Sequence, residues 1–141
     1  MIKLMDLIRL TGLSMGKFKI HCATGVNPTP LEAFYDGKFK PWQEYQGNRN
    51  FECDHILSLI HVGGSDRLFA GIYMVNGVKP KSDNEKSWFE YSTSETPGLD
   101  HLVGRAIIVF NKTFRASYLK GERYADLLMV KEIKAERQSI G

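Results

Sequence analysis

Side chains suited to ligand recognition gather in three stretches of this chain. Aromatic rings can stack on bases, amides can read base edges, and Arg and Lys can meet phosphates. In combination, these residue types favour binding of a nucleic acid or a nucleotide. The competing interpretation is that the rings belong to the core and the charges to a solvated surface. The candidate binding residues are Trp42, Gln43, Tyr45, Arg49 and Asn50, then Trp88, and finally Arg105, Arg115, Ser117 and Tyr118.

Residues that could bind a metal or act as nucleophiles are present, but their spacing does not fit such sites. The sequence has no HxH or HxxxH pattern, and Cys53-Asp54-His55 would place neighbours on opposite faces of a strand. The serines lie in no nucleophile elbow, and the chain has no phosphate-binding glycine loop. We therefore expect no metal, no cofactor and no catalytic residue within these 141 residues.

One tripeptide, Gly71-Ile72-Tyr73, matches the first half of the GIY-YIG nuclease signature. That signature also needs YIG or YVG shortly afterwards, then an Arg on a helix and a Glu that binds a divalent metal. The residues that follow, MVNGVKPKSDNEKS, contain no such tripeptide, and no helix with a well-placed Arg is expected after them. We interpret the tripeptide as part of an apolar strand, with a glycine where backbone or a ligand comes close.

The overall composition is that of one globular domain in a reducing compartment. The chain has 141 residues, of which 43% are apolar and 25% charged. No apolar run is long enough to span a bilayer and the N-terminus lacks a signal-peptide pattern, so we expect a cytoplasmic protein. Cys22 and Cys53 are expected to be buried and unpaired. The net charge of +3 and the pI of about 8.8 permit nucleic-acid binding without demonstrating it.

The elements that must position the candidate residues are short strands linked by turns. The central one is a hairpin over residues 51–78, whose strands are joined at Gly63-Gly64-Ser65-Asp66. Asn76-Gly77 predicts a second turn, followed by a mobile polar segment over 79–86. Further strands are predicted over 17–23, 88–93, 105–110 and 127–133, and helical segments over 2–12, from Pro30, from Pro41 and over 120–126, with a helix over 120–137 as the alternative to the last strand.

Alternation along residues 17–23 predicts that Phe18, Ile20 and Cys22 face the core and that His21 faces solvent. Because the strands are linked mostly by tight turns, the sheet should be mainly antiparallel. The predicted fold class is α+β: a small, curved, mainly antiparallel sheet or partly closed β-barrel with two or three short flanking helices. Residues 1–141 are expected to form a single nucleic-acid-recognition domain.

The chain resembles the N-terminal, non-catalytic part of bacterial GIY-YIG nuclease family proteins. The resemblance rests on FYDGKFKPWQEYQGNRNFECDHILSLI, LFAGIYMVNGV, GRAIIVFNKTFRASYL and LLMVKEIKAERQSI, and it extends over residues 3–140. In such proteins a separate nuclease domain follows and carries the true GIY-YIG pair, so the resemblance implies that this chain is either one domain of a longer nuclease or a free-standing relative. The expected sheet with short helices and an aromatic face is also similar to PUA, EVE and ASCH-like domains, which bind nucleic acids or flipped modified bases.

The resemblance implies a DNA-recognition domain of a restriction-type or genome-defence endonuclease from a bacterium or phage, which senses a modified or flipped base. In that function Trp42, Tyr45 and Trp88 would stack on the base. The edge readers would be Gln43 and Asn50, and the phosphate contacts would be Arg49, Arg105 and Arg115. The alternatives are a module that binds a small molecule or nucleotide in the same aromatic pocket, and a protein-interaction adaptor in phage or host defence.

Overall fold

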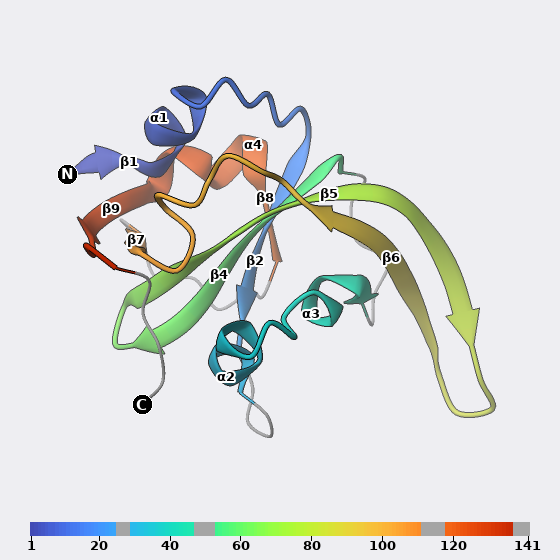
Figure 1. Cartoon of the computed structure of the whole chain (residues 1–141). Helices are drawn as coiled ribbons and strands as arrows, with labels where there is room; N and C mark the ends of the chain where they lie inside the picture. Colours follow the sequence, from blue (N-terminus) through green and yellow to red (C-terminus); the bar gives the residue numbers. More distant parts are fainter. Residues whose placement is uncertain (25–28, 47–52, 111–117, 137–141) are drawn as a thin grey trace.

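The computed structural model describes residues 1–24, 29–46, 53–110 and 118–136, and its strands form one sheet (Figure 1). The strands are β1 (Ile2–Lys3), β2 (Phe18–Ala23), β3 (Tyr45–Gln46), β4 (His55–Gly63), β5 (Asp66–Ser82), β6 (Ser87–Glu95), β7 (Ala106–Phe110), β8 (Tyr118–Lys120) and β9 (Leu128–Ile133). The helices are α1 (Leu4–Arg9), α2 (Pro30–Tyr35), α3 (Pro41–Glu44) and α4 (Gly121–Tyr124), with a 3-10 turn at Ala125–Leu127. Within these ranges, seven of the nine strands follow the order β1-β9-β7-β5-β4-β2-β8, and β6 lies off this path and pairs with β5 and β3.

The sheet is open and mixed, with mostly antiparallel pairs. β1 and β8 are the two ends of its main path, so the strands of the described ranges do not close into a barrel. β2 and β4 run parallel, from Phe18 opposite His55 to Ala23 opposite Ile60. A parallel pair needs a crossover connection, and the segment that contains α2 and α3 provides it. The predicted α+β class with a mainly antiparallel sheet and short helices is confirmed, whereas the parallel pair is a feature that the turn-rich sequence does not predict.

The β4–β5 hairpin lies in the middle of the sheet, as the sequence predicts. Gly63 and Gly64 have positive φ angles of 142° and 56°, which allow the tight turn. Residues 55–60 of β4 are buried. Their side chains alternate between two apolar clusters, one that includes α1 and one that includes α2. The hairpin therefore separates two cores, which explains its nearly continuous apolar sequence.

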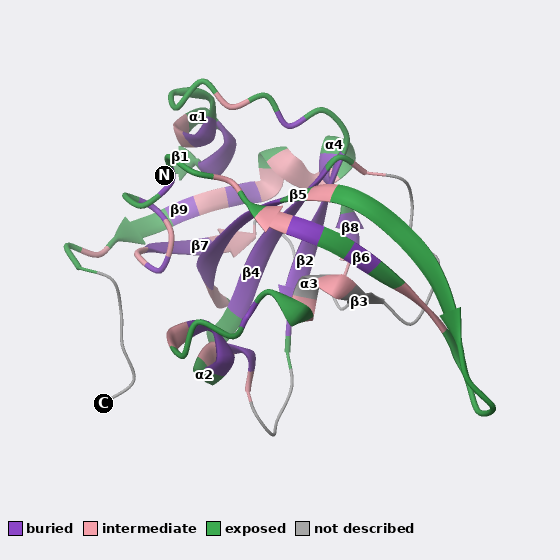
Figure 2. Cartoon of the chain, turned by 45° about the vertical axis from the view of Figure 1, so that its right-hand side comes forward, coloured by how far each residue is buried: buried purple, intermediate pink, exposed green. Residues whose placement is uncertain are grey.

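Residues 76–90 leave the body of the protein as a two-stranded ribbon, which we call the arm (Figure 2). It consists of the second half of β5, a turn and the first half of β6. Residues 76–87 are all exposed. The Asp83 carboxylate holds the turn, because it accepts hydrogen bonds from the backbone N–H groups of Glu85 and Lys86 at 2.8 and 2.9 Å. At the base of the arm β3 pairs with Phe89 and Glu90, and Phe89 packs against the core. Residues 76–87 thus form a hairpin with little packing of its own.

Asn76-Gly77 does not form the predicted turn, and the polar segment after it is a strand. The β5–β6 ladder instead has a register shift between Val75 and Gly77, where β5 carries an extra residue. Such a bulge bends a strand and adds twist without ending it. The dipeptide that usually closes a hairpin therefore bends β5, and the chain reverses at residues 83–86.

The short helices lie where the sequence predicts them. Thr29 caps α2 with its side chain, which accepts a hydrogen bond from the backbone N–H of Glu32 at 3.1 Å, and Pro30 is the first helical residue. Near the C-terminus, α4 is followed by strand β9 rather than by the alternative long helix. Among the described residues, no helix is both long and apolar enough to cross a membrane.

Candidate ligand-binding site

A cavity lies where the two neighbours of β5 separate along one of its edges. β7 pairs with β5 at residues 67–68, and β6 pairs with it from Tyr73 onward. Between these stretches, the connection from β6 to β7 donates two backbone hydrogen bonds, at 2.8 and 2.9 Å, to the carbonyl oxygens of Phe69 and Ile72. The connection thus passes beside β5 instead of extending the sheet. The space that remains is a cavity of about 150 Å³.

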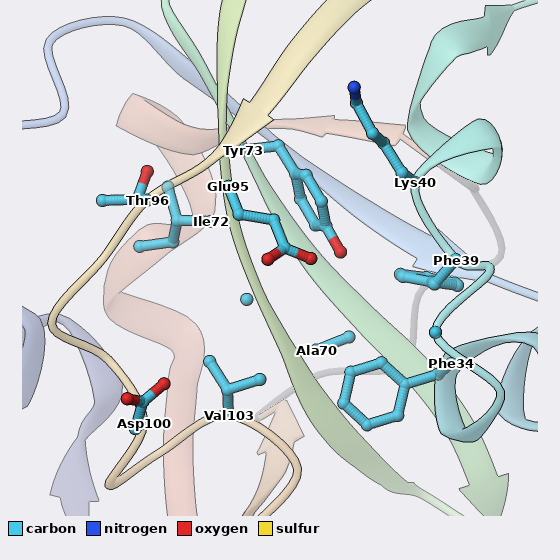
Figure 3. Close-up of a pocket in the computed structure, with 12 residues that line it drawn as sticks. Phe34, Phe39, Lys40, Ala70, Ile72, Tyr73, Glu95, Thr96, Asp100 and Val103 are labelled. Carbon is cyan, nitrogen blue, oxygen red and sulfur yellow. The ribbon is translucent and has the colours of Figure 1, made fainter.

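The cavity has an aromatic side and a polar side (Figure 3). Phe34 of α2 and Phe39 lie on the aromatic side with Tyr73 of β5, and the ring centroids of Phe39 and Tyr73 are 6.4 Å apart. Glu95 at the end of β6 and Asp100 in the following connection supply carboxylates. The other lining residues are Gly37, Lys40, Ala70, Gly71, Ile72, Thr96 and Val103.

The polar groups of the cavity are placed by the β5–β6 ladder. Tyr73 stands directly opposite Glu95 in that ladder, and its hydroxyl lies beside the Glu95 carboxylate (Figure 3). The Lys40 ammonium points away from them. Tyr73 is buried, whereas Glu95 and Asp100 are exposed, so the cavity meets solvent on its carboxylate side. A hollow with aromatic walls and a few convergent polar groups is the usual form of a small-ligand site.

Gly71 lies in the floor of the cavity and confirms the strand interpretation of its tripeptide. Its φ of 118° is an angle that residues with a side chain rarely adopt. A Cβ atom at this position would lie 3.7 Å from Val103 Cγ2 and 3.8 Å from Tyr73 Cε2, which are ordinary contact distances. The backbone angle therefore requires a glycine at this position. The absence of a side chain also leaves the cavity deeper here than it would be with any other residue.

A second group of aromatic and titratable side chains is closed within the fold around β2. The Lys19 Nζ atom lies 4.1 Å from the ring centroid of Tyr91 and 4.7 Å from that of Tyr118. The His21 ring stacks on Tyr118 with centroids 4.6 Å apart. Lys19 has no exposed surface and His21 is 5% exposed, so the prediction that His21 faces solvent is wrong. Tyr91 of β6 covers this face of β2, which alternation within one strand cannot reveal.

Burial controls the protonation of this group, which we call the Lys19 cluster (Lys19, His21, Tyr91 and Tyr118). It lowers the pKa of Lys19 to about 8, and the nearby Cys53 partly opposes that shift. Burial also raises the pKa of Tyr118 to about 12, with a further contribution from Tyr91. The aromatic faces attract the ammonium and compensate for part of its lost hydration. The side chains of the Lys19 cluster therefore interact with one another inside the fold, and the contact between Lys19 and Tyr91 holds β6 against β2.

Trp42 is positioned by α3, which is anchored on β6. The Glu44 carboxylate accepts hydrogen bonds from the backbone N–H and the hydroxyl of Thr93 at 3.1 and 3.3 Å. Trp42 is partly buried and stacks on Phe39, with ring centroids 6.4 Å apart. Phe39 lines the cavity and Trp42 does not, so Trp42 supports the cavity wall from behind.

Tyr45 lies beside the arm and Trp88 lies on it, whereas Gln43 belongs to α3. β3 pairs with β6, with Tyr45 opposite Glu90. Trp88 is partly buried and stands opposite Lys81 in the β5–β6 ladder. The structure therefore places Tyr45 and Trp88 along the same half of β6, at the end of the strand away from the cavity.

Tyr118 and Arg105 have partners within the fold. Tyr118 belongs to the Lys19 cluster. Arg105 donates from Nε to the backbone oxygen of Lys134 at 2.8 Å and so ties β7 to the end of β9. β7 lies on the far side of the molecule from the arm, so Arg105 is not brought together with Trp88 (Figure 1). Four further predicted residues, Arg49, Asn50, Arg115 and Ser117, lie outside the described residues.

The residues that shape the cavity are missing from the sequence-based prediction. They come from α2 and the segment after it, from β5, from the end of β6 and from the connection to β7, and no local pattern links these segments. One signal was available, because a glycine inside an apolar strand indicates a close approach of backbone or ligand. The residues in question are Phe34, Phe39, Tyr73, Glu95 and Asp100.

The described residues contain no group of three His, Cys, Asp or Glu side chains that could hold a metal ion. Cys22 is buried and Cys53 is partly buried, and neither forms a disulfide. Burial raises the pKa of both thiols, which keeps them protonated at neutral pH.

The chain matches no protein-family model, no curated protein and no solved structure. The arm and the cavity are thus the features from which a function can be inferred.

Proposed function

We propose that this chain is a non-catalytic DNA-recognition domain, which places the arm in the major groove and holds one extruded base in the cavity. The observation that carries the proposal is the arm, an ordered two-stranded ribbon whose residues 76–87 are all exposed. An isolated two-stranded hairpin is marginally stable in water, and a two-stranded β-ribbon fits the major groove of B-DNA. Both facts support contact between the arm and a duplex.

The arm carries side chains of both signs. Its lysines are suited to phosphate contacts: Lys79, Lys81 and Lys86. Its acidic residues are Asp83, which is engaged in the turn, and Glu85 and Glu90. Because the charges balance, we expect a small number of phosphate contacts rather than a broad electrostatic surface. Three contacts correspond to a slope of about −2.7 for log K against log salt concentration.

Cleavage would belong to another domain, in keeping with the resemblance to the N-terminal part of GIY-YIG nuclease family proteins. In this domain Gly71 and Tyr73 line the cavity, which supports a structural use of the GIY tripeptide. The cavity then replaces the predicted Trp42, Tyr45 and Trp88 as the place where a base would be held. Aromatic walls and a polar edge are the features with which proteins grip a flipped base.

The first test is the salt dependence of binding to a labelled duplex, measured by fluorescence anisotropy. Replacing Lys79, Lys81 and Lys86 together by Ala should weaken binding at low salt and reduce the slope by about 2.7, since three phosphate contacts are lost. The matched control replaces Lys3, Lys131 and Lys134 by Ala, three lysines of β1 and the β9 end. An equal effect of both triple variants, or no binding of plain or modified duplexes at low salt, contradicts the proposal.

The second candidate function is a module that binds a small molecule or nucleotide. It is favoured by the fact that the residues lining the cavity lie outside the arm, so a ligand needs no contact with residues 76–90. A nucleotide that binds the folded state raises the melting temperature. Such a rise without any binding to DNA would support this candidate against the first.

A further inference from the structure

The cavity combines aromatic walls with negative charge at its opening. The rings of Phe34, Phe39 and Tyr73 line it and are buried, whereas Glu95 and Asp100 line it and are exposed (Figure 3). The ring centroid of Phe39 lies 5.9 Å from that of Phe34 and 6.4 Å from that of Tyr73, with interplanar angles of 86° and 59°. Rings that are inclined to one another bound a space from several sides. The cavity is therefore an aromatic enclosure that opens toward two carboxylates.

The Lys19 cluster shows how aromatic rings accommodate a cation in this fold. The Lys19 ammonium lies 4.1 Å from the ring centroid of Tyr91 and 4.7 Å from that of Tyr118. Aromatic rings attract positive charge at such distances, and the attraction is stronger where water is excluded. The cavity offers rings of the same kind, together with two carboxylates, to a molecule that enters from solvent.

The charges around the cavity favour a positively charged ligand. Lys40 is the only cationic side chain among the described residues that line it. This lysine is exposed, and its ammonium points away from Tyr73 and Glu95 (Figure 3). The lining side chains therefore carry two negative charges and one positive charge. Their field attracts a cation to the opening and opposes the entry of a phosphate.

The composition of the walls indicates which kind of cation fits. A metal ion needs several ligand atoms, and the described residues contain no group of three His, Cys, Asp or Glu side chains that could hold one. Aromatic rings suit an organic cation, whose delocalised charge is weakly hydrated. The volume of about 150 Å³ equals that of about five water molecules at roughly 30 Å³ each. This is space for one planar ring system with a delocalised charge.

We infer that the cavity selects a base that carries a positive charge, the class that methylation of a ring nitrogen produces. N1-methyladenine and N3-methylcytosine belong to this class and are cationic at neutral pH. The aromatic rings hold the base by stacking and by attraction of its charge, and Glu95 and Asp100 balance that charge at the opening. Tyr73 contributes its ring, so the selection does not depend on its hydroxyl. For its setting in DNA, with the base extruded from the duplex, this inference rests on the proposed function.

Isomeric nucleosides test the selection without DNA and without a phosphate. 1-Methyladenosine and N6-methyladenosine contain the same atoms, but only the first is cationic at neutral pH. The isomers 3-methylcytidine and 5-methylcytidine form a second such pair. Isothermal calorimetry or ligand-observed NMR measures their dissociation constants. We expect each cationic isomer to bind about tenfold more tightly than its neutral partner, and this preference should decrease at high salt because the carboxylates are screened.

A double variant assigns the preference to the carboxylates. Glu95→Gln combined with Asp100→Asn should reduce the preference from about tenfold to about twofold, because only the attraction of the rings remains. Binding of the neutral isomers should change little, since their interaction with the rings is retained. Glu122→Gln is the matched control: it removes a carboxylate from an exposed position on α4 and should leave the preference unchanged.

Two single variants test the remaining groups of the cavity. Lys40→Gln should strengthen binding of the cationic isomers by about two- to threefold and leave the neutral isomers unchanged, because a nearby positive charge is removed. Lys3→Gln, at an exposed position of β1, is its control and should have no effect. Tyr73→Phe should keep the preference, because the ring is retained. Loss of the preference in Tyr73→Phe would contradict selection by charge.

Equal binding of the isomers, no binding of the cationic nucleosides at millimolar concentration, or an unchanged preference in the double carboxylate variant would overturn the inference. Binding of tetramethylammonium as tight as that of 1-methyladenosine would also overturn it, because the cavity would then recognise charge without a base. Preference for the cationic nucleosides without any affinity for DNA supports the cationic-base site and contradicts the proposed function. Salt-dependent DNA binding without this preference supports the proposed function and contradicts the cationic-base site.

Discussion

The Lys19 cluster and the cavity combine aromatic rings with charged groups, yet they differ in what the charges face. In the Lys19 cluster the ammonium has no exposed surface and lies over the rings of Tyr91 and Tyr118. In the cavity the Tyr73 ring is buried, while the Glu95 carboxylate is exposed to solvent. The first arrangement uses its charge within the fold, and the second leaves its charge accessible to a ligand. Residue type alone therefore does not distinguish a structural cluster from a binding site.

The largest expected effect concerns Tyr91, which is 4% exposed and covers Lys19. Tyr91→Leu should lower the free energy of unfolding by about 3 to 4 kcal/mol, because a buried ammonium loses one of its aromatic partners. Glu95→Gln should change it by less than about 0.5 kcal/mol, since this side chain is exposed. Urea denaturation measures the free energy of unfolding of both variants, and an m-value equal to that of the wild type shows that the comparison is valid. Similar losses in the two variants would remove the distinction between the two regions.

Lys19→Met should stabilise the protein by about 2 kcal/mol at pH 7, because it removes a buried charge and keeps the apolar chain. The pH dependence of the free energy of unfolding shows whether the buried charge of Lys19 is the cause of this stabilisation. Below pH 8 Lys19 is charged in both the folded and the unfolded protein, so the stability of the wild type is reduced by the full free-energy cost of burying the ammonium. Between about pH 8 and 10.5 the unfolded chain still holds a proton that the folded chain has lost, so wild-type stability rises with pH.

Methionine has no proton to lose, so the advantage of Lys19→Met should shrink across this window and disappear above it. Denaturation midpoints of both proteins at pH 7, 8, 9 and 10 provide the measurement, and Lys3→Met, at an exposed position of β1, is the control. If the stability difference between Lys19→Met and the wild type stays constant over this range, burial of the Lys19 charge is not the cause of that difference.

A smaller destabilisation than at Tyr91 is expected at Gly71, which lines the cavity. Gly71→Ala should cost about 1 to 2 kcal/mol, because alanine must adopt a φ of 118°, while its methyl group meets ordinary contact distances. The substitution should also leave the pKa of Lys19 unchanged, and NMR titration of the lysine measures this result. A changed pKa of Lys19 would indicate that the two regions are coupled.

Local patterns were sufficient to predict most elements of the fold. Alternating and apolar runs located β2, β4, β5, β6, β7 and β9, and Thr29 with Pro30 marked the start of α2. Two errors share one physical reason, which is that tertiary contacts override a local signal. His21 is buried because Tyr91 and Tyr118, distant in sequence, surround β2. Asn76-Gly77 bends a strand instead of closing a turn, because β6 pairs with β5 beyond it.

The candidate site was less predictable than the fold. Its walls come from segments that are 20 or more residues apart, such as Phe39, Tyr73 and Glu95, and only the pairing of β5 with β6 brings the last two together. Sequence reasoning favoured Trp42 and Trp88, because aromatic rings can stack on bases. Trp42 instead supports Phe39 from behind, and Trp88 lies on the arm.

One continuous strand carries both the cavity floor and the tip of the arm. From Gly71 to Ser82, β5 makes eleven residue steps of about 3.3 Å, which places the two positions at most about 36 Å apart. One helical repeat of B-DNA measures about 34 Å. The bulge between Val75 and Gly77 bends β5, so the true separation is shorter than this limit. If the proposed function holds, an extruded base over Gly71 and a groove contact near Ser82 would therefore lie within one repeat of each other, and the length of β5 would limit the footprint to about ten base pairs.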